Sequence, residues 1–515
     1  MGFGIMDGNN KKEYGDYQTP DYFAIKVCDL LRNDLHLDPK VIIEPTSGVG
    51  NFLNAALSSF EKIKKAIGLE INPEYCDECR KHIGDKRLQV INDNFFSYQI
   101  EKHIGDEETL VIGNPPWAMN SDLNFNLPEK ENFKRLSGTD AITGASNFDI
   151  CEYIILKLIE KSVNKNVAIA MLCKTSVARN VLLELDRNDT CVDVVRMYNF
   201  NSTKVFGISA PACMLYIKMS MVNKKCRECD IFEIDTPNMM CGKIAFQNGK
   251  LSNSNDGELD LDGECFIEWR QGVKHDCAGV MELEKKGEHC YKNKKKEVIE
   301  LEDTLIFPLM KSSSFKKPII NSNFNKYVII TQKKTREETD YIEELAPKTW
   351  KYLCERKEAF DSRKSRIYNG APAFSMFGVG DYSYAKYKVG ISGFYKKPLF
   401  ALLYNKEKID HPIMVDDTSY FLSFNNYSDA YTCMLLLNCD RVQKFLLSIS
   451  FQDAKRPYTK KVLQRIDFSK CIQNITFEEL VETEREMDLP ETITTGMYDA
   501  FTNFVADLKK CWIEK

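Results

Sequence analysis

The sequence contains no long hydrophobic run, and none of its apolar stretches reaches the ~18 residues that a membrane-spanning helix requires. Its first twenty residues, MGFGIMDGNNKKEYGDYQTP, also lack the apolar segment of a secretory signal peptide. We therefore expect a cytoplasmic protein with no membrane partner.

Histidine is scarce, whereas cysteine is not. The six histidines show no H-E-x-x-H spacing, so nothing indicates a catalytic metal. The 18 cysteines are scattered through a chain without an export signal, where thiols are normally reduced, and most are expected in the core. Two pairs have zinc spacing: Cys76 and Cys79 lie on an expected helix with no second pair nearby, and Cys226 and Cys229 would need distant partners at irregular intervals. We expect no bound metal.

An overall excess of positive charge is also absent, because the formal net charge is -5. Residues 311–410 nevertheless hold 20 Lys and Arg against 11 Asp and Glu. Such a local excess either neutralises phosphates or forms a solvated basic face. The length of 515 residues, 43% of them hydrophobic, allows two or three soluble domains.

Short apolar runs alternate with amphipathic segments between residues 17 and 220. Strands are expected near 41–43, 66–69, 88–91, 110–112 and 167–172, with helices near 52–65, 73–83 and 150–162. A possible capping box, Ser146 to Asp149, precedes the last of these helices. Two final strands are expected near 192–197 and 212–218. This alternation predicts an α/β domain with a mostly parallel sheet.

The sequence pattern changes near residue 222, after which polar stretches such as QNGKLSNSNDGELDLDGE lack long helical periodicity. Helical patterning returns from about residue 476. We therefore expect three regions: an α/β domain at 1–222, a mixed α+β domain at 223–475, and a helical segment at 476–515 that packs against the rest.

A glycine-rich turn follows the first expected strand in VIIEPTSGVGNF, residues 41–52. Gly48 and Gly50 allow a ligand to approach the backbone where a strand ends. The dinucleotide fingerprint is excluded, because Leu53 stands where a third glycine is required. Glu70 ends the next strand, where a carboxylate can accept both hydroxyls of a ribose. Together these residues indicate a cofactor crevice.

A second motif, VIGNPPWA at residues 111–118, ends the fourth expected strand. Pro115 and Pro116 cannot continue a helix or donate to a ladder, so they impose a rigid extended turn. The turn presents the Asn114 side chain and the Pro115 carbonyl as two acceptors, and Trp117 adds a flat apolar wall. This arrangement suits a planar amine whose N–H groups are held while its ring is stacked.

The combination of E-P-T-S-G-x-G-x-F with N-P-P-W about 60 residues later resembles the S-adenosylmethionine-dependent N6-adenine DNA methyltransferases. The resemblance covers roughly residues 17–220. It implies a Rossmann-like methyltransferase domain with a C-terminal target-recognition domain, S-adenosylmethionine as the cofactor and double-stranded DNA as the partner. A separate cognate restriction endonuclease is compatible with it.

The resemblance also implies roles for particular residues. The catalytic turn is Asn114, Pro115, Pro116 and Trp117, and Phe206 of a V-F-G element joins Trp117 in stacking on the target base. The family element is V-F-P, so Gly207 departs from it. The cofactor is held by Thr19, Pro20, Glu44, Pro45, Thr46, Gly48, Gly50, Phe52, Glu70, Ile71, Asp93, Asn94 and Phe95. The family usually reads D-F-F at the last position, where this chain has N-D-N-F-F, so either Asp93 or Asn94 accepts from the cofactor adenine.

The motif order is similar to the gamma class of this family, whose recognition residues lie C-terminal to the catalytic motif. Only about 20 residues separate Asn94 from Asn114, which leaves no room for a recognition domain between them. Basic residues beside aromatics can contact phosphates and guanine edges. The candidates for DNA binding are Arg270, Lys274, Lys311, Arg363, Lys364, Arg366, Lys455 and Arg456.

The expected reaction is direct attack of an adenine N6 nitrogen on the sulfonium methyl group, with the base flipped out of the duplex. The enzyme then belongs to a restriction-modification system or acts alone. Two alternatives stay open. N-P-P-aromatic turns also serve methylation of RNA or of a protein glutamine, and a subunit that keeps the fold without turnover would bind DNA only.

Overall fold

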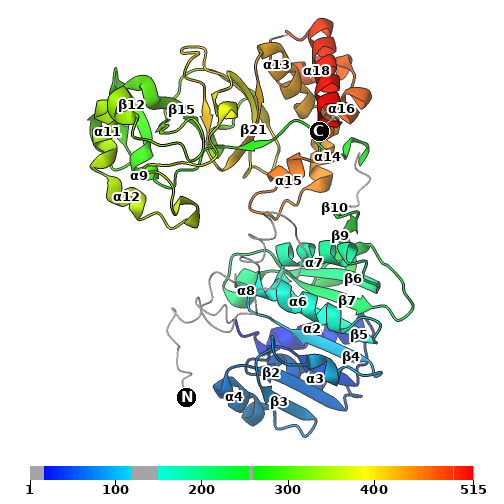
Figure 1. The fold of residues 1–515 in the computed structure, drawn as a ribbon. Coiled ribbons are helices and arrows are strands. Elements are labelled where there is room, and N and C mark those ends of the chain that lie inside the picture. The colour runs from blue at the N-terminus through cyan, green and yellow to red at the C-terminus, as the bar shows by residue number, and fades with distance from the viewer. Residues whose placement is uncertain (1–16, 119–148, 254–258, 491, 514–515) are drawn as a thin grey trace. The chain divides into compact units, whose positions relative to one another are not determined.

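The computed structural model describes residues 17–118, 149–253, 259–490 and 492–513, which form two compact units (Figure 1). Unit 1 comprises residues 1–255 and unit 2 residues 256–515. Among the described helices, none is both long and apolar enough to cross a membrane.

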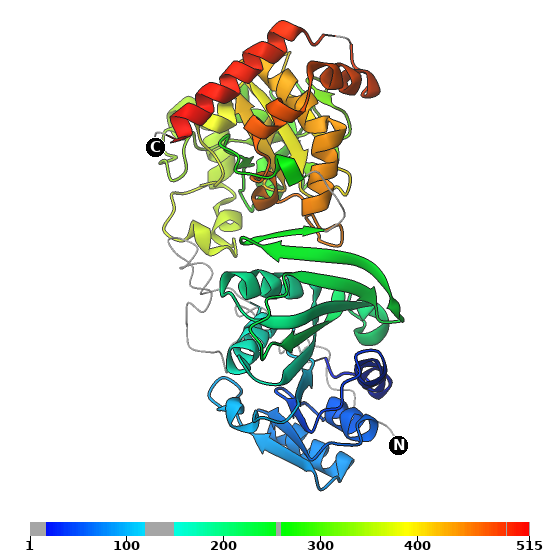
Figure 2. The ribbon, with the colours of Figure 1, turned by 90° about the vertical axis from the view of Figure 1, so that its right-hand side faces the viewer.

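Unit 1 is built on one mixed sheet. Its described strands lie in the order β3 (Leu88–Asn92), β2 (Lys65–Glu70), β1 (Val41–Glu44), β4 (Thr109–Gly113), β5 (Val167–Lys174), β7 (Ala212–Met219), β6 (Val192–Phe200), β8 (Glu228–Glu233), β9 (Thr236–Gln247) and β10 (Lys250–Asn253). Neighbouring strands from β3 to β5 are parallel, and β7 is antiparallel to both β5 and β6. Figure 2 shows β9, in green, as a long curved strand.

The chain crosses from β1 to β2 and β3 on one side and then returns to β4 on the other side of β1. Right-handed crossovers place the helices after β1 and β2 on one face of the sheet and those after β4 and β5 on the opposite face. The helical elements of unit 1 are α2 (Asp21–Asn33), α3 (Asn51–Ser59), α4 (Pro73–Ile83), η1 (Ile100–His103), α6 (Ile150–Lys161), α7 (Thr175–Arg187) and α8 (Ser202–Phe206). The strand order reverses between β1 and β4, and the carboxyl ends of the strands at such a reversal are where open α/β sheets usually bind their ligands.

The expected secondary structure of this unit is largely confirmed. The five expected parallel strands correspond to β1 to β5, and every residue of β1 and β4 is buried, as in a sheet covered on both faces. The helix expected at 52–65 ends at Ser59, because Phe60 is extended and Lys65 already belongs to β2. Asp149 caps α6 by accepting from the Cys151 N–H, while Ser146 lies outside the described residues.

The sheet of unit 1 continues past the boundary expected at residue 222 by three strands. Strand β8 pairs with β6, and β9 and β10 continue the same sheet to Asn253. These are outer strands with one exposed face, so their sequence is polar and resembles loops. The sheet of unit 1 therefore extends some thirty residues beyond the expected end of the α/β domain.

Unit 2 is a mixed α+β unit, as expected. One sheet has the order β11 (Arg270–Gln271), β21 (Ser419–Phe424), β18 (Tyr387–Ser392), β19 (Phe400–Leu403) and β16 (Ile319–Ile320). The other has the order β14 (Val298–Glu300), β13 (Cys290–Asn293), β12 (Glu282–Gly287), β17 (Tyr327–Ile329), β15 (Ile306–Met310) and β20 (Met414–Val415). Short helical elements connect the strands: η3 (Leu259–Leu261), α9 (Ala278–Met281), η4 (Asp303–Leu305), η5 (Ser312–Ser314), α10 (Ile342–Leu345), α11 (Pro347–Cys354), α12 (Lys357–Asp361), η6 (Arg366–Tyr368) and η7 (Asp381–Tyr384).

The C-terminal helices complete the larger core of unit 2. They are α13 (Tyr427–Asn438), α14 (Asp440–Ile449), α15 (Lys460–Leu463), α16 (Phe468–Asn474), α17 (Phe477–Glu486) and α18 (Thr495–Ile513), the last drawn in red in Figure 2. Leu480 of α17 and Phe501 of α18 are fully buried in the same cluster as Leu435 of α13. The helical segment expected at 476–515 is therefore part of unit 2 and has no core of its own.

Strand β11 approaches β20 closely at Gly272, where an added Cβ would lie 2.1 Å from the Val415 carbonyl oxygen. Because the obstacle is backbone, we expect Gly272→Ala to destabilise unit 2 by about 2–4 kcal/mol. Gly279→Ala is the matched control, since its nearest contact is an ordinary 3.8 Å to a lysine side chain. Chemical denaturation of both variants tests this, and equal stabilities would contradict the close approach.

Candidate active site

The glycine turn after β1 is fixed to the end of β2 by the carboxylate of Glu70. The Gly48 N–H donates to Glu70 Oε2 at 2.8 Å, and the Asn72 N–H donates to Oε1 at 2.8 Å. Gly48 has a φ of 51° and Gly50 a φ of 87°, both in the left-handed region. A Cβ at Gly48 would also lie 2.4 Å from the side-chain oxygen of Gln18. Both glycines are therefore required by conformation and by space.

Three buried polar atoms of residues at the end of β1 and in the following turn have no hydrogen-bond partner among the described residues: Glu44 Oε2, Thr46 Oγ1 and Ser47 Oγ. Burial raises the pKa of the Glu44 carboxyl well above its usual value, and the nearby Glu70 raises it further, while the Leu53 N–H opposes the shift. Buried polar groups are normally paired, so these atoms indicate a polar ligand.

The third part of the crevice follows β3. Asp93 is exposed, its N–H donates to the Glu70 carbonyl at 3.1 Å, and its Oδ1 accepts from the Asn94 N–H at 2.7 Å. The Oδ1 of Asn94 is already used, because it accepts from the Phe96 N–H at 2.9 Å. Ile71, directly after β2, is apolar yet 43% exposed. Ile71 and Asp93 therefore offer an apolar surface and an acidic hydrogen-bond acceptor to a flat ring of a ligand.

The remaining cofactor candidates surround the same crevice. Thr19 is buried, and its carbonyl accepts from the Asn51 side chain at 2.7 Å at the start of α3. Pro20 precedes α2, Pro45 follows β1, and Phe52 is buried in the first turn of α3. Phe95 lies 5.8 Å from Phe96, edge to face, and is half-buried.

The Asn-Pro-Pro-Trp turn lies at the end of β4, on the same edge of the sheet. The side-chain nitrogen of Asn114 donates to the Tyr17 carbonyl at 2.8 Å. Asn114 Oδ1 is buried and accepts from no described residue. The amide is thus held by its nitrogen, and its oxygen is left as an oriented acceptor.

Trp117 and Phe206 form a corner beside that acceptor. Their ring centroids are 5.5 Å apart with an interplanar angle of 73°. Phe206 ends the short helix α8, which Asn201 caps at its start and Gly207 ends with a φ of 72°. Aromatic contacts with Tyr17, Phe23 and Phe200 support the Phe206 ring. The substitution of proline by Gly207 thus keeps a helix-ending residue at this position.

Three residues that the sequence reasoning did not select hold the turn in place: Tyr17, Asp149 and Lys174. Tyr17 acts through its backbone, which no side-chain pattern reveals. Lys174 ends β5, so its position at the carboxyl edge of an expected strand was the available signal. It contacts Asp149 Oδ2 at 3.0 Å and the Trp117 carbonyl at 3.5 Å.

Two of the expected DNA-binding residues are committed to contacts inside unit 2. Arg363 donates to the Ser375 carbonyl at 2.6 Å, and its guanidinium lies 3.6 Å from the centre of the Tyr368 ring. Lys311 Nζ is 2.7 Å from Oε1 of Glu282, a residue that is only 6% exposed. Their placement gives both residues a structural role in the unit and does not favour contact with DNA.

Other candidates lie at the surface over aromatic rings. The Arg270 guanidinium is 4.4 Å from the Tyr382 ring centre, and Arg456 and Lys455 lie 4.9 and 6.0 Å from that of Phe394. Lys364 is exposed, and Lys274 is 3.5 Å from Asp276. The side chain of Arg366 lies outside the described part of the structure.

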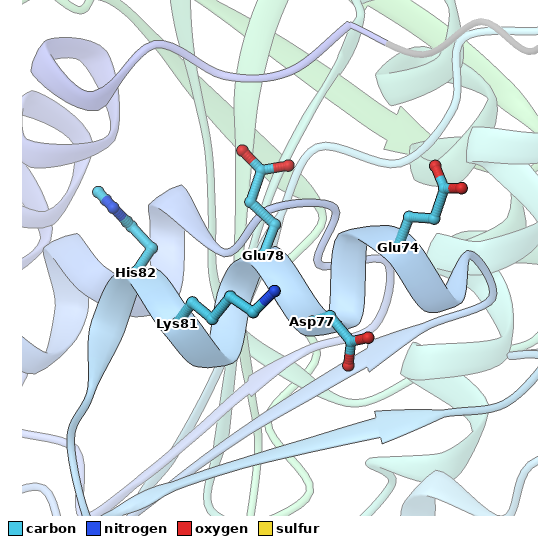
Figure 3. A pocket seen from close by; sticks show the side chains of 5 residues that line it. All are labelled: Glu74, Asp77, Glu78, Lys81 and His82. Carbon is cyan, nitrogen blue, oxygen red and sulfur yellow. The ribbon is translucent and has the colours of Figure 1, made fainter.

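A surface hollow on α4 stands apart from these residues. Figure 3 shows its lining, which comes from one helix: Glu74, Asp77, Glu78, Lys81 and His82. All five side chains are exposed, so none of them supplies a buried polar atom to the hollow. Among the described residues no group of three or more His, Cys, Asp or Glu side chains is arranged to hold a metal.

A sheet with this strand order, whose ligand groups gather where the order reverses, is the Rossmann-like methyltransferase fold that the motifs predicted. No protein-family model matches the chain. The chain is 39% identical over 472 residues to the type II methyltransferase M.NspV of Nostoc sp., covering 89% of this chain and 96% of that protein. The chain therefore belongs to the type II methyltransferases.

Two solved structures show more distant likeness. One is described as a class I S-adenosylmethionine-dependent methyltransferase from Listeria monocytogenes, with 13% identity, a TM-score of 0.31, and coverage of 42% of this chain and 65% of that one. The other is a type I restriction-modification methyltransferase subunit from Streptococcus thermophilus, with 13% identity, a TM-score of 0.31, and coverage of 44% and 53%.

The raised pKa of Glu44 generates a prediction about pH. Below an unfolded-state pKa of about 4 the carboxyl is neutral in both states, and as pH rises above it the folded state is increasingly disfavoured. Glu44→Gln should therefore raise the melting temperature of the ligand-free protein, and the gain should grow from pH 5 to pH 8. Exposed Glu78→Gln on α4 is the control. A gain that does not change with pH would contradict the burial of a titrating carboxyl.

Proposed function

We propose that this protein transfers a methyl group from S-adenosylmethionine to the N6 amino group of adenine in double-stranded DNA. The observation that carries the proposal is the Asn114 side chain, whose nitrogen is bound to Tyr17 and whose buried oxygen has no partner among the described residues. An acceptor held in this way, beside a corner of aromatic rings, suits an amino group on a flat base.

The proposed chemistry follows from the electronic structure of the amino group. Its lone pair is delocalised into the adenine ring, so the nitrogen is a poor nucleophile until its protons are held out of the ring plane. Asn114 Oδ1 and the Pro115 carbonyl oxygen accept hydrogen bonds from the two N–H groups and so hold those protons in place. Because the rigid turn and the Tyr17 contact fix the acceptors beforehand, little reorganisation accompanies the reaction.

The crevice fits S-adenosylmethionine by the chemistry of its donors. When bound, the cofactor supplies an electrophilic methyl group. Glu70, with its carboxylate fixed by two backbone N–H groups, accepts from the ribose hydroxyls, and Ile71 covers the adenine. Thr46, Ser47 and Glu44 would hold the methionine part, which would supply partners for side-chain oxygens that have none among the described residues.

The target atom is inaccessible in a duplex, so the base must be flipped at a cost of a few kcal/mol. Stacking on Trp117 and Phe206 offsets this by about 1–3 kcal/mol per base. Cations over rings in unit 2 are suited to phosphates and guanine edges, above all the exposed Lys455 and the half-buried Arg270 and Arg456. We place the enzyme in the cytoplasm, as the gamma-class modification partner of a separate restriction endonuclease or as a solitary enzyme.

The proposal is tested by expressing the protein in a host that lacks DNA methylation and sequencing its DNA with a long-read method that detects modified bases. N6-methyladenine in one sequence context supports it. N4-methylcytosine would keep the DNA substrate but overturn the base. Methylation confined to RNA or to a protein glutamine would overturn the substrate, and cofactor binding without any transfer would indicate a binding subunit.

Asn114 is expected to be essential for transfer but not for cofactor binding. Asn114→Ala removes one of the two acceptors and should lower kcat by at least about a hundredfold. Asn114→Gln keeps the amide but displaces it by one methylene, and should also be strongly impaired. Single-turnover transfer of labelled methyl groups and calorimetric binding of S-adenosylmethionine separate the two steps. An active Asn114→Ala would contradict the mechanism.

We assign the contact with the cofactor adenine to Asp93, because Asn94 Oδ1 is already occupied by the Phe96 N–H. Asp93→Ala should weaken S-adenosylmethionine binding about tenfold or more, as expected for loss of a charge-assisted hydrogen bond. Asn94→Ala should have the smaller effect on affinity. Calorimetry of both variants decides between them, and the reverse order of affinities would make Asn94 the contact.

A further inference from the structure

The side chain of Lys174 links the catalytic turn to the start of α6. Lys174 is the last residue of β5, and its side chain is 28% exposed. Its Nζ lies 3.0 Å from Asp149 Oδ2 and 3.5 Å from the carbonyl oxygen of Trp117. One ammonium group is therefore shared between a carboxylate and the backbone of the residue that forms the aromatic wall.

Asp149 is well placed to hold that ammonium group. Its side chain is 9% exposed, and its other oxygen caps α6 by accepting from the Cys151 N–H at 3.0 Å. The adjacent Ile150 N–H donates to the Ala118 carbonyl at 3.0 Å. Ala118, which directly follows Trp117, is thus attached to the first turn of α6, and Lys174 reinforces this attachment from β5.

The turn is held at both of its ends by different means. At its start the Asn114 amide is bound to the Tyr17 carbonyl, and the two prolines stiffen the middle. At its end the position of the Trp117 backbone depends on Lys174 and on the start of α6. A small displacement of this carbonyl moves the indole ring, which meets Phe206 edge to face at 5.5 Å.

We propose that Lys174 is a positioning residue, which holds Trp117 where the flipped base must stack. The inference rests on the proposed function, since it assigns Lys174 a part in presenting the target base. Lys174 acts through Trp117 and does not touch the reacting atoms. Its loss should therefore slow methyl transfer while S-adenosylmethionine binds as before.

The test compares Lys174→Met and Lys174→Arg in the full-length protein, with unmethylated plasmid DNA as substrate. Loss of a charge-assisted hydrogen bond should lower kcat roughly ten- to a hundredfold in Lys174→Met. Lys174→Arg keeps the cation and should recover most of the rate. The dissociation constant of S-adenosylmethionine and the melting temperature should stay close to those of the unaltered protein.

Lys218 offers a matched control on the adjacent strand β7. It is 21% exposed and pairs with Glu108 at 3.3 Å and with Asn166 at 2.8 Å, at the opposite end of the sheet. Lys218→Met removes a similar half-buried ion pair and should leave kcat within about threefold of the unaltered protein. An equal loss of kcat in both variants would overturn the inference, because it would reveal a general effect on stability.

A double-mutant cycle tests whether Lys174 acts through the indole ring. If it does, Lys174→Met should cost less than about threefold in a Trp117→Ala background, since the ring it positions is already gone. Additive effects would overturn the inference, as would an unchanged kcat in Lys174→Met alone. Absence of methyl transfer by the unaltered protein would overturn the proposed function together with this inference.

Discussion

The hydrogen bond from the Asn114 side chain to the Tyr17 carbonyl joins two segments that are 97 residues apart in the chain. An amide can present either its oxygen or its nitrogen to a ligand, and an isolated asparagine turns freely between the two. Binding of the nitrogen by a backbone carbonyl removes that freedom. The chemistry of the site then depends on how firmly the segment before α2 lies against the end of β4.

That dependence explains why the polar groups of unit 1 gather at one edge. The Thr19 carbonyl accepts a hydrogen bond from the Asn51 side chain. The short segment that contains Tyr17 and Thr19 is therefore attached both to the start of α3, after the glycine turn, and to the catalytic turn. Glu70 joins the glycine turn to β2 in a similar way. The buried Glu44 carboxyl belongs to this arrangement, and one of its oxygens has no partner among the described residues, which lowers the stability of the ligand-free fold.

Much of unit 1 could be predicted from the sequence, because its strands are short apolar runs and its turns carry glycine and proline. Gly48, Gly50 and Asn114 were found for that reason, and the structure brings them to one edge of the sheet. The contacts of backbone atoms could not be predicted, so Tyr17 was missed. The DNA-binding role expected for Arg363 and Lys311 stays a prediction, although both side chains contact groups inside unit 2. The sequence pattern of a cation beside aromatic residues is the same whether the side chain faces solvent or contacts carbonyls and carboxylates inside the unit. Only the packing of unit 2 distinguishes these two placements.

The likeness to the Nostoc methyltransferase extends into unit 2. The 472 residues aligned with the Nostoc methyltransferase exceed the 255 residues of unit 1, so the likeness must continue through much of unit 2. A fold shared by many methyltransferases needs only the sheet and its crevice for the reaction. Unit 2 holds Arg270 and Arg456 over aromatic rings, an arrangement suited to phosphates and base edges, and it is therefore the part of the chain to which we assign the proposed choice among DNA sequences.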